Sequence, residues 1–584
     1  MRYHAPVARS HPYKTEPSKW PYRIAATGIF LAEIIVLPGA ASPFRVPKDA
    51  VILAAVCLAV GLATVAAARR GALTLPRGPL SAVLLALPVI QAASSLWSAN
   101  PLRAVQSALL SAIWVAGILW IATIGEASRR QLAIVAASAV VVSSLVMFLQ
   151  VAGIPVFTLS PAFSEGRMSL TGLTGNPSDV AMAAVLLLPL LLTARSEATR
   201  PRLIAAMVFI LATATVLTQS LAGVAALIAV FLVWLVQQRS RRLWVGASAA
   251  GVALLLLAFS SGLGTRVVAG VESMQRGDWY QLLSARGDGW GASAEMIETR
   301  PFTGVGAANF TQEFYPSHLA WLDRHGRRGG RGELATHFSW AHCDPLQLQA
   351  ELGVVGSLWL AVLLWAIVRT RARVGPVLPL AAAALAPFVA LHYPTHLTVG
   401  LIPCALIAGG LVAADAEPYP VAWRLRAPVA VVVMLAAIVG AGWQLRRVAV
   451  DLWMGTLELQ LAVAEGSAPD IRARRALAIE AMVLSRIGRM PLAEPTLWRT
   501  VGRARLLQGD VKGAEKAFRS AFAGWPHEDA EFYLGLSLFA QGRRTEALHH
   551  LGRVCRTNPA LVTLIGDPDL RRLVEDVLAA SSTR

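Results

Sequence analysis

The chain has 584 residues, of which 55% are hydrophobic and only 15% are charged. Soluble domains carry about 25% charged residues, so this composition excludes an ordinary soluble protein and predicts an integral membrane protein. The net charge of +18 does not indicate a nucleic-acid partner, because the basic residues lie mostly in short clusters between apolar stretches. That pattern is typical of membrane topology.

A membrane-crossing helix needs about 20 mostly apolar residues. Thirteen such stretches predict an all-α, polytopic protein with 12–13 transmembrane helices. They are 22–40, 50–68, 78–97, 103–124, 131–152, 179–195, 202–219, 221–237, 243–262, 352–369, 375–394, 396–415 and 427–446. The first span follows a polar, basic arm at 1–21, which indicates an anchor rather than a cleaved signal peptide.

The distribution of basic residues between loops predicts the orientation. With the N-terminal arm inside, the inside segments hold 20 basic residues and the short outside loops hold 4. Loops rich in Lys and Arg stay in the cytoplasm. The arm is therefore expected in the cytoplasm. The long polar segment 263–351 and, because thirteen spans is an odd number, everything after residue 446 are expected outside, in the periplasm or cell exterior of a bacterium.

The outside loop before the sixth span carries a cation, Arg167. Its Gly, Thr and Asn residues, including Asn176, leave backbone amides free, and such amides suit an anion. Ser178 or Asp179 is expected to cap the sixth span.

Segment 263–351 carries a second fixed cation. Arg286 opens a stretch to about Thr299 that reads as a short amphipathic helix, ended by Pro301 and followed by a turn at Gly304 and Gly306. Arg286 is either a solvated or lipid-contacting arginine or a clamp for phosphate or pyrophosphate, for which a planar guanidinium is suited.

A cluster of ionisable residues lies just before the tenth span. Asp344 is expected to cap a helix, with Pro345 at its first position and Gln347 closing a capping box. His342 precedes this cap. The nearby helix N-terminus disfavours imidazolium, so His342 is either a loop histidine bonded to backbone or a neutral general base. A zinc site using His337 fits poorly, because the spacing matches no standard ligand pattern.

Two other groups of residues give weaker signals. His392 and His396 belong to a turn between spans and could face one cavity with the cluster. Cys57 and Cys404 lie in apolar spans and are expected to be small core residues, so the four cysteines predict no disulfide framework.

The tail, 447–584, reads as a separate domain of helical repeats. Small and large residues recur at the spacing of tetratricopeptide repeats in two blocks about 33 residues apart. The first block has Trp498, Gly502, Gly509, Ala514, Phe518, Ala521 and Pro526, and the second has Leu534, Gly535, Gly542, Ala547, Leu551 and Pro559. Residues 450–490 are helical in pattern and are a candidate third unit. Such repeats bind a protein partner or serve a structural role.

Four motifs together resemble the O-antigen ligase and O-antigen polymerase superfamily, over roughly residues 80–415. The matching residues are Arg286 with Trp290; Pro301, Gly304 and Gly306; His342 followed by Gly353 and Gly356; and Asn176 with Pro177. Two positions depart from the pattern. Cys343 replaces the usual Asn, and the turn Ser220-Leu221-Ala222-Gly223 lacks the arginine that many members carry there.

The resemblance implies a metal-independent membrane glycosyltransferase without a cofactor, in the bacterial inner membrane. The donor would be a glycan on undecaprenyl pyrophosphate at the outer face, and the acceptor would be lipid A core, a growing surface polysaccharide or exopolysaccharide, or a protein. His342 would be the catalytic base, Arg286 would hold the pyrophosphate, and Arg167, Asn176, Trp290 and His337 would contact substrate.

Two other functional classes stay open. A non-catalytic envelope scaffold would recruit partners through the repeats. A transporter is disfavoured, because transporters usually carry ionisable residues inside their spans, and here Glu33 is the main exception.

Overall fold

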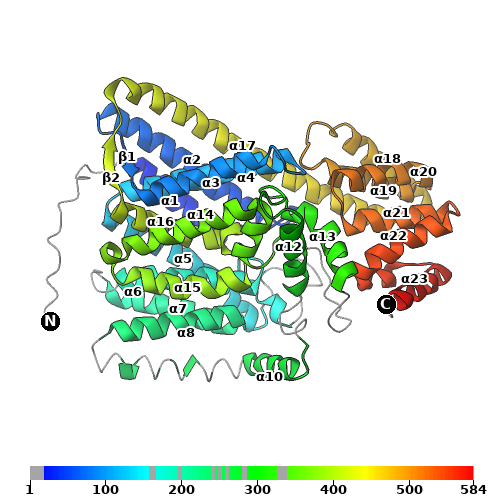
Figure 1. Cartoon of the computed structure of the whole chain (residues 1–584), viewed down its shortest axis with the longest axis horizontal. Coiled ribbons are helices and arrows are strands. Elements are labelled where there is room, and N and C mark those ends of the chain that lie inside the picture. The colour runs from blue at the N-terminus through cyan, green and yellow to red at the C-terminus, as the bar shows by residue number, and fades with distance from the viewer. Residues whose placement is uncertain are drawn as a thin grey trace.

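The computed structural model describes residues 19–154, 156, 166–194, 200–238, 262–278, 286–325 and 338–582, and isolated residues between 244 and 256. A bundle of long helices occupies one part of the molecule, and a row of shorter helices extends beyond one end of it (Figure 1). The predicted all-α polytopic fold is confirmed.

Every predicted span except 243–262, which lies mostly outside the described residues, coincides with a helix of the bundle. Seven of these helices are long and apolar enough to cross a membrane, and four more are apolar but shorter. The bundle helices are α1 (Lys19–Ile34), α2 (Val46–Arg69), α3 (Pro79–Ser94), α4 (Pro101–Thr123), α5 (Glu126–Val151), α6 (Pro177–Ala194), α7 (Pro201–Leu217), α8 (Leu221–Gln237), α14 (Asp344–Val374), α15 (Val377–Leu391), α16 (Thr398–Asp415) and α17 (Trp423–Glu465).

Helix α6 is the centre of the bundle. Its residues from Val180 to Leu188 are at most 1% exposed, and it packs against α5, α7, α8, α15 and α16. A helix that is apolar on every face is stable only when neighbours cover it all round. The start of α6 is therefore a fixed point on which other elements of the molecule are positioned.

One end of the bundle gathers the basic loops, and we call it the basic end. Strand β1 (Thr74–Arg77) pairs antiparallel with β2 (Glu417–Pro420) there (Figure 1). Arg129, Arg130 and Arg373 line one hollow together with the last turns of α6 and α16. Of the loops that the charge pattern places on one side of a membrane, these described ones thus lie at one end of the molecule.

The opposite end carries the polar segments, and we call it the site end. Its elements are η2 (Gly166–Ser169), α10 (Leu263–Gln275), α12 (Arg286–Thr299), α13 (Phe310–His325) and η4 (Pro394–His396). Helices α12 and α13 pack on the start of α14 through a small apolar core that includes Met296, Phe310, Phe314 and Phe338. This core fixes the loop that precedes α14.

Helix α17 joins the bundle to the tail without a break. It starts beside β2 at the basic end and runs for 43 residues, or about 65 Å at 1.5 Å per residue. The hydrocarbon core of a bilayer is only about 30 Å thick, so the helix projects well beyond the site end. The predicted domain boundary at residue 446 falls inside this helix.

The tail folds as helical hairpins. Its helices are α18 (Pro469–Leu484), α19 (Glu494–Leu507), α20 (Val511–Gly524), α21 (Glu528–Ala540), α22 (Arg544–Thr557), η5 (Pro559–Leu564) and α23 (Pro568–Ser582). A Cβ at Gly502 would lie 2.6 Å from the Phe518 ring, and one at Gly535 would lie 2.7 Å from Leu551. Small residues therefore let the paired helices approach, as the repeat pattern predicts. The assignment to tetratricopeptide repeats stays a prediction.

The tail docks on α13 at the site end. Tyr315 and Glu531 are both fully buried, and the tyrosine hydroxyl donates to the carboxylate. Further polar contacts join Gln312 to Gly524, Thr311 to Trp525 and Asp323 to Arg556. The repeats and the polar segments of the bundle thus form one continuous structure.

Candidate active site

His342 lies at the site end, two residues before α14, in a strained backbone conformation. Its φ is +56°, in the left-handed region that costs a non-glycine residue about 1–2 kcal/mol. Neighbouring contacts hold the loop in place, since Gln347 Oε1 accepts from the Ala341 amide at 3.0 Å. Strain of this kind concentrates at functional sites, where the surrounding structure over-determines it.

The geometry also selects the tautomer of His342. Its Nδ1 lies 3.0 Å from the carbonyl oxygen of Trp340. A carbonyl can only accept, so Nδ1 must carry the hydrogen, and the basic lone pair of the neutral ring is on Nε2. The ring therefore has the form that a general base requires.

Burial lowers the pKa of His342 to about 3, and the charges of Arg286, His392 and Arg45 lower it in the same direction. The hydrogen bond to Trp340 opposes the shift. The imidazole is consequently neutral at pH 7. A bound anion would offset the repulsion from the two arginines and raise this pKa toward the value at which a base works best.

Arg286 is the first residue of α12 and reaches the end of α15. Its Nε donates to the Leu391 carbonyl at 2.8 Å, one residue before His392. Trp290 lies one turn further along α12, on the same helix face as Arg286. Its ring is half-buried, and its Nε1 has no hydrogen-bond partner among the described residues.

An aromatic wall lines the site beside His342. The Tyr393 ring lies edge-on to His342 at 4.7 Å and to His392 at 4.4 Å, and it stacks on Trp340 at 4.9 Å. Arg45, from the loop before α2, lies 4.0 Å over the Trp340 ring. Residues from four separate parts of the sequence thus converge on one place.

His392 pairs with a residue that the sequence assigns elsewhere. Its Nε2 lies 3.1 Å from Asp179 Oδ1, and both side chains are buried. The expectation that Ser178 or Asp179 caps the sixth span is wrong. Asn176 Oδ1 accepts from the Ser178 amide at 2.8 Å, because the helix starts after Asn176 and its side chain is the one that reaches the first turn. The Asp179 carboxylate instead lies within ion-pair distance of His392.

Asp344 also differs from its prediction as an N-cap. Cys343 occupies the cap position and makes no side-chain cap bond. The Asp344 carboxylate accepts instead from the Thr395 amide at 3.1 Å and lies 3.2 Å from His396 Nδ1. Asp344 therefore makes a charge-assisted contact across the site in place of the expected N-cap hydrogen bond. This contact joins the start of α14 to the turn before α16.

The two glycine motifs of the site end pack on each other. The turn that contains Gly304 and Gly306 lies against the start of α14, where Gly353 breaks the helix with a φ of +60°. Three backbone hydrogen bonds of 2.8–3.0 Å join the two segments, from Val305 to Ala350, from Gly306 to Glu351 and from Val354 to Pro301. These motifs therefore join the turn after α12 to the start of α14, the helix that follows His342.

Three predicted substrate contacts lie outside this geometry. His337 and the side chain of Arg167 fall outside the described residues; the backbone of Arg167 lies in η2. The Asn176 side chain is engaged at the start of α6. A role for these residues stays a prediction. Across the described ranges, no three His, Cys, Asp or Glu side chains are arranged to hold a metal ion.

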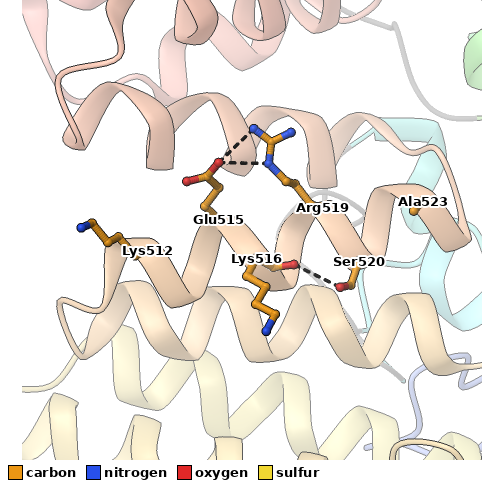
Figure 2. A pocket seen from close by; sticks show the side chains of 6 residues that line it. All are labelled: Lys512, Glu515, Lys516, Arg519, Ser520 and Ala523. Carbon is orange, nitrogen blue, oxygen red and sulfur yellow. Dashed lines mark hydrogen bonds and ion pairs between the residues drawn. The ribbon is translucent and has the colours of Figure 1, made fainter.

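A separate surface hollow lies on α20 of the tail (Figure 2). It is lined by Lys512, Glu515, Lys516, Arg519, Ser520 and Ala523. Glu515 pairs with Arg519 at 2.9 Å and with Arg543 at 2.8 Å, so the carboxylate in this lining is already engaged by two arginines. It contains no nucleophile or base in a strained or buried setting. The chemistry of the molecule is therefore best sought at His342.

The fold and this site define a polytopic membrane protein with an enzyme-like centre at one end of its bundle. Residues 205–361 match the protein-family model described as O-antigen ligase. The matched segment contains Arg286, both glycine motifs and His342, which confirms the superfamily predicted from these residues. A search of curated proteins found no match. The family supports a membrane glycan ligase or polymerase.

Proposed function

We propose that the protein transfers a glycan from undecaprenyl pyrophosphate to an acceptor hydroxyl at the outer face of the bacterial cytoplasmic membrane. The observation that carries the proposal is His342, a strained and neutral imidazole with Nε2 as its basic nitrogen, within the electrostatic reach of Arg286. A base beside a fixed cation is what attack on a phosphate-activated sugar requires.

The orientation follows from the two ends of the bundle. Loops rich in arginine favour the cytoplasm, and they gather at the basic end. The site end, with His342 and the docked tail, then lies in the periplasm. A lipid-linked diphosphate sugar presented in the outer leaflet reaches such a site directly.

Residues of this chain are proposed to move the proton and to stabilise the leaving group. His342 Nε2 takes the proton of the acceptor hydroxyl as its oxygen forms a bond to the anomeric carbon. The bond from that carbon to the diphosphate oxygen breaks, and Arg286 stabilises the charge that develops on the leaving group. Attack opposite the leaving group inverts the anomeric centre. The proton then passes from His342 to the diphosphate or to water.

Other residues complete the proposed site. Trp290 lies one helical turn from Arg286 and offers to substrate an indole N–H that has no hydrogen-bond partner among the described residues. Arg167 and His337 are proposed as further substrate contacts, and Asn176 as a residue that shapes the start of α6 after the loop that carries Arg167. No metal ion or cofactor has a part in the scheme.

The acceptor is proposed to be a growing polysaccharide, with lipid A core or a protein as alternatives. The tail is held against α13, which is continuous with the site through the core of Phe310 and Phe314. A partner bound to the repeats would therefore lie on the same side of the membrane as the growing chain. This arrangement suits a polymerase more than a ligase that acts alone.

The proposal is tested by measuring, with purified components, how much undecaprenyl pyrophosphate is released for each glycan transferred. The purified full chain in lipid nanodiscs is supplied with a glycan on undecaprenyl pyrophosphate and an acceptor, with and without EDTA. We expect one undecaprenyl pyrophosphate released for each glycan transferred, at the same rate in EDTA. If a monodisperse preparation binds the donor but releases no undecaprenyl pyrophosphate, the result would support a non-catalytic scaffold instead.

A further inference from the structure

The hollow at the basic end is built by five helices of the bundle. It lies between α5, α6, α14, α15 and α16 and has a volume of about 260 Å³. The proposed reaction does not use it, because His342 and Arg286 lie at the site end. The hollow is therefore a candidate site for a different ligand.

The mouth of the hollow has an excess of positive charge. Arg129, Arg130 and Arg373 line it, and Glu126 supplies the one carboxylate among the described lining residues. Glu126 pairs with Arg130 at 2.6 Å. Arg129 donates from Nη1 to the carbonyl oxygen of Ile124, a neutral acceptor that leaves its charge in place. Three arginines against one glutamate leave the lining cationic.

A carboxylate just outside the lining does little to neutralise this charge. Asp415 Oδ1 lies 3.9 Å from Nη1 of Arg373, whose side chain is 61% exposed, and its Oδ2 accepts from the Leu80 amide at 3.1 Å. A long ion pair of an exposed arginine contributes little. The first turns of α5 and α15 also border the hollow, and helix N-termini carry partial positive charge. An anion with several oxygens suits such a place, because guanidinium groups pair with phosphate oxygens.

Deeper in the hollow the lining is apolar. Leu190, Leu406 and Ile407 lie there. On α16, Leu406 precedes the last residue of the helix, Asp415, by nine residues, or about 13 Å at 1.5 Å per residue. A lining that is cationic at the mouth and apolar below matches an amphiphile with a phosphate head and hydrocarbon chains. Pockets that enclose a drug-sized molecule measure about 300–1,000 Å³, so this smaller hollow suits a headgroup whose chains lead out into the bilayer.

We propose that the hollow binds one anionic phospholipid of the leaflet at the basic end. The headgroup phosphate lies between the three arginines, and an acyl chain runs past Leu406 and Ile407 into the bilayer. Basic pockets between membrane helices on the cytoplasmic side suit anionic headgroups for the same physical reason. The proposal goes beyond the proposed function, and it can hold or fail independently of catalysis at the site end.

A lipid titration of the purified full chain in detergent tests the role of the charges, with bound lipid counted by native mass spectrometry. We expect the wild type to bind one phosphatidylglycerol more tightly than phosphatidylcholine. Arg130→Ala/Arg373→Ala should bind phosphatidylglycerol roughly 10- to 100-fold more weakly. Arg129 is kept, because its hydrogen bond to a backbone carbonyl supports the local fold. The control, Arg69→Ala/Arg424→Ala, removes the same charge from exposed arginines of the basic end that do not line the hollow, and it should match the wild type.

A second variant fills the hollow and leaves every charge in place. Gly410 lies in the lining on α16, and a Cβ there would meet no described atom within 4 Å. Gly410→Leu therefore places a side chain in open space, and leucine is favourable in a helix. We expect phosphatidylglycerol binding to weaken roughly 10-fold, because the acyl chain loses its packing surface. Gly442→Leu on α17 is the control: its Cβ also meets no described atom within 4 Å, and it lies outside the lining.

The outcomes separate a lipid site from its alternatives. Equal binding by the wild type and Arg130→Ala/Arg373→Ala would overturn the proposal. Equal weakening by the control arginine pair would also overturn it, because binding would then reflect general attraction to surface charge. Displacement of the lipid by inorganic phosphate at a similar concentration would mean a site for the free anion instead. Folding is checked by size-exclusion chromatography, and if the arginine pair does not fold, unchanged binding by Gly410→Leu would still overturn the assignment.

Discussion

Replacing His342 by alanine is expected to lower the rate of glycan transfer roughly 10²- to 10⁴-fold, the usual contribution of a positioned general base. The loss should appear in kcat rather than in the affinity for the donor, because Arg286 and its neighbours stay in place. Rates are measured in membranes at matched expression. His549→Ala, an exposed histidine on α22, is the control and should match the wild type.

The dependence of kcat/KM on pH tests the role of His342 as a base in a second way. Since burial, followed by Arg286 and His392, lowers the pKa of His342 to about 3, the ring of the free enzyme is neutral at every pH well above that value. Only protonation removes the base, so kcat/KM should stay flat from about pH 5 to 8. An acid limb centred near the ordinary histidine pKa of about 6.5 would contradict the assignment.

Replacing Gly353 by alanine is expected to destabilise the fold. Gly353 has a φ of +60°, and a Cβ there would lie 2.4 Å from the backbone carbonyl of Phe302. The conformation alone costs about 1–2 kcal/mol, and forcing two backbones apart adds about 1–3 kcal/mol. A lower melting temperature of the purified protein in detergent would report this.

Gly375→Ala is the matched control for that measurement. Gly375 also has a positive φ, +66°, but a Cβ there would meet nothing within 4 Å. It should show only the conformational cost. Equal melting temperatures for the two variants would mean that the contact between the glycine motifs contributes nothing to stability.

The sequence predicted the bundle well because membrane helices depend on composition. A stretch of apolar residues about 20 long has few alternatives in a bilayer, so α2, α5 and α16 appear where the pattern put them. The full lengths of α14 and α17, 31 and 43 residues, could not be predicted in the same way. Their polar ends are helical because α12, α13 and the tail pack on them.

The site was predicted in part. Arg286 and His342 could be identified from motif order, and the structure brings them together at the site end. His392 gave only a weak signal, and Asp179 gave none as a site residue. Each lies far from the motif in sequence, and its contribution depends on which helix ends meet. Asp344 was misplaced because local capping rules compete with partners from other segments, and in this case Thr395 and His396 are the partners.

The measurement that tests the account most directly is glycan transfer in membranes that contain Arg286→Ala, Arg286→Lys or the exposed control Arg276→Ala, with the product resolved on a gel. If Arg286 holds the leaving diphosphate beside His342, the transfer rate of the alanine variant should fall at least about 100-fold. The lysine variant should keep part of the activity, because it retains the charge. The control should match the wild type. Full product from Arg286→Ala at matched expression would contradict a catalytic site at this end of the bundle.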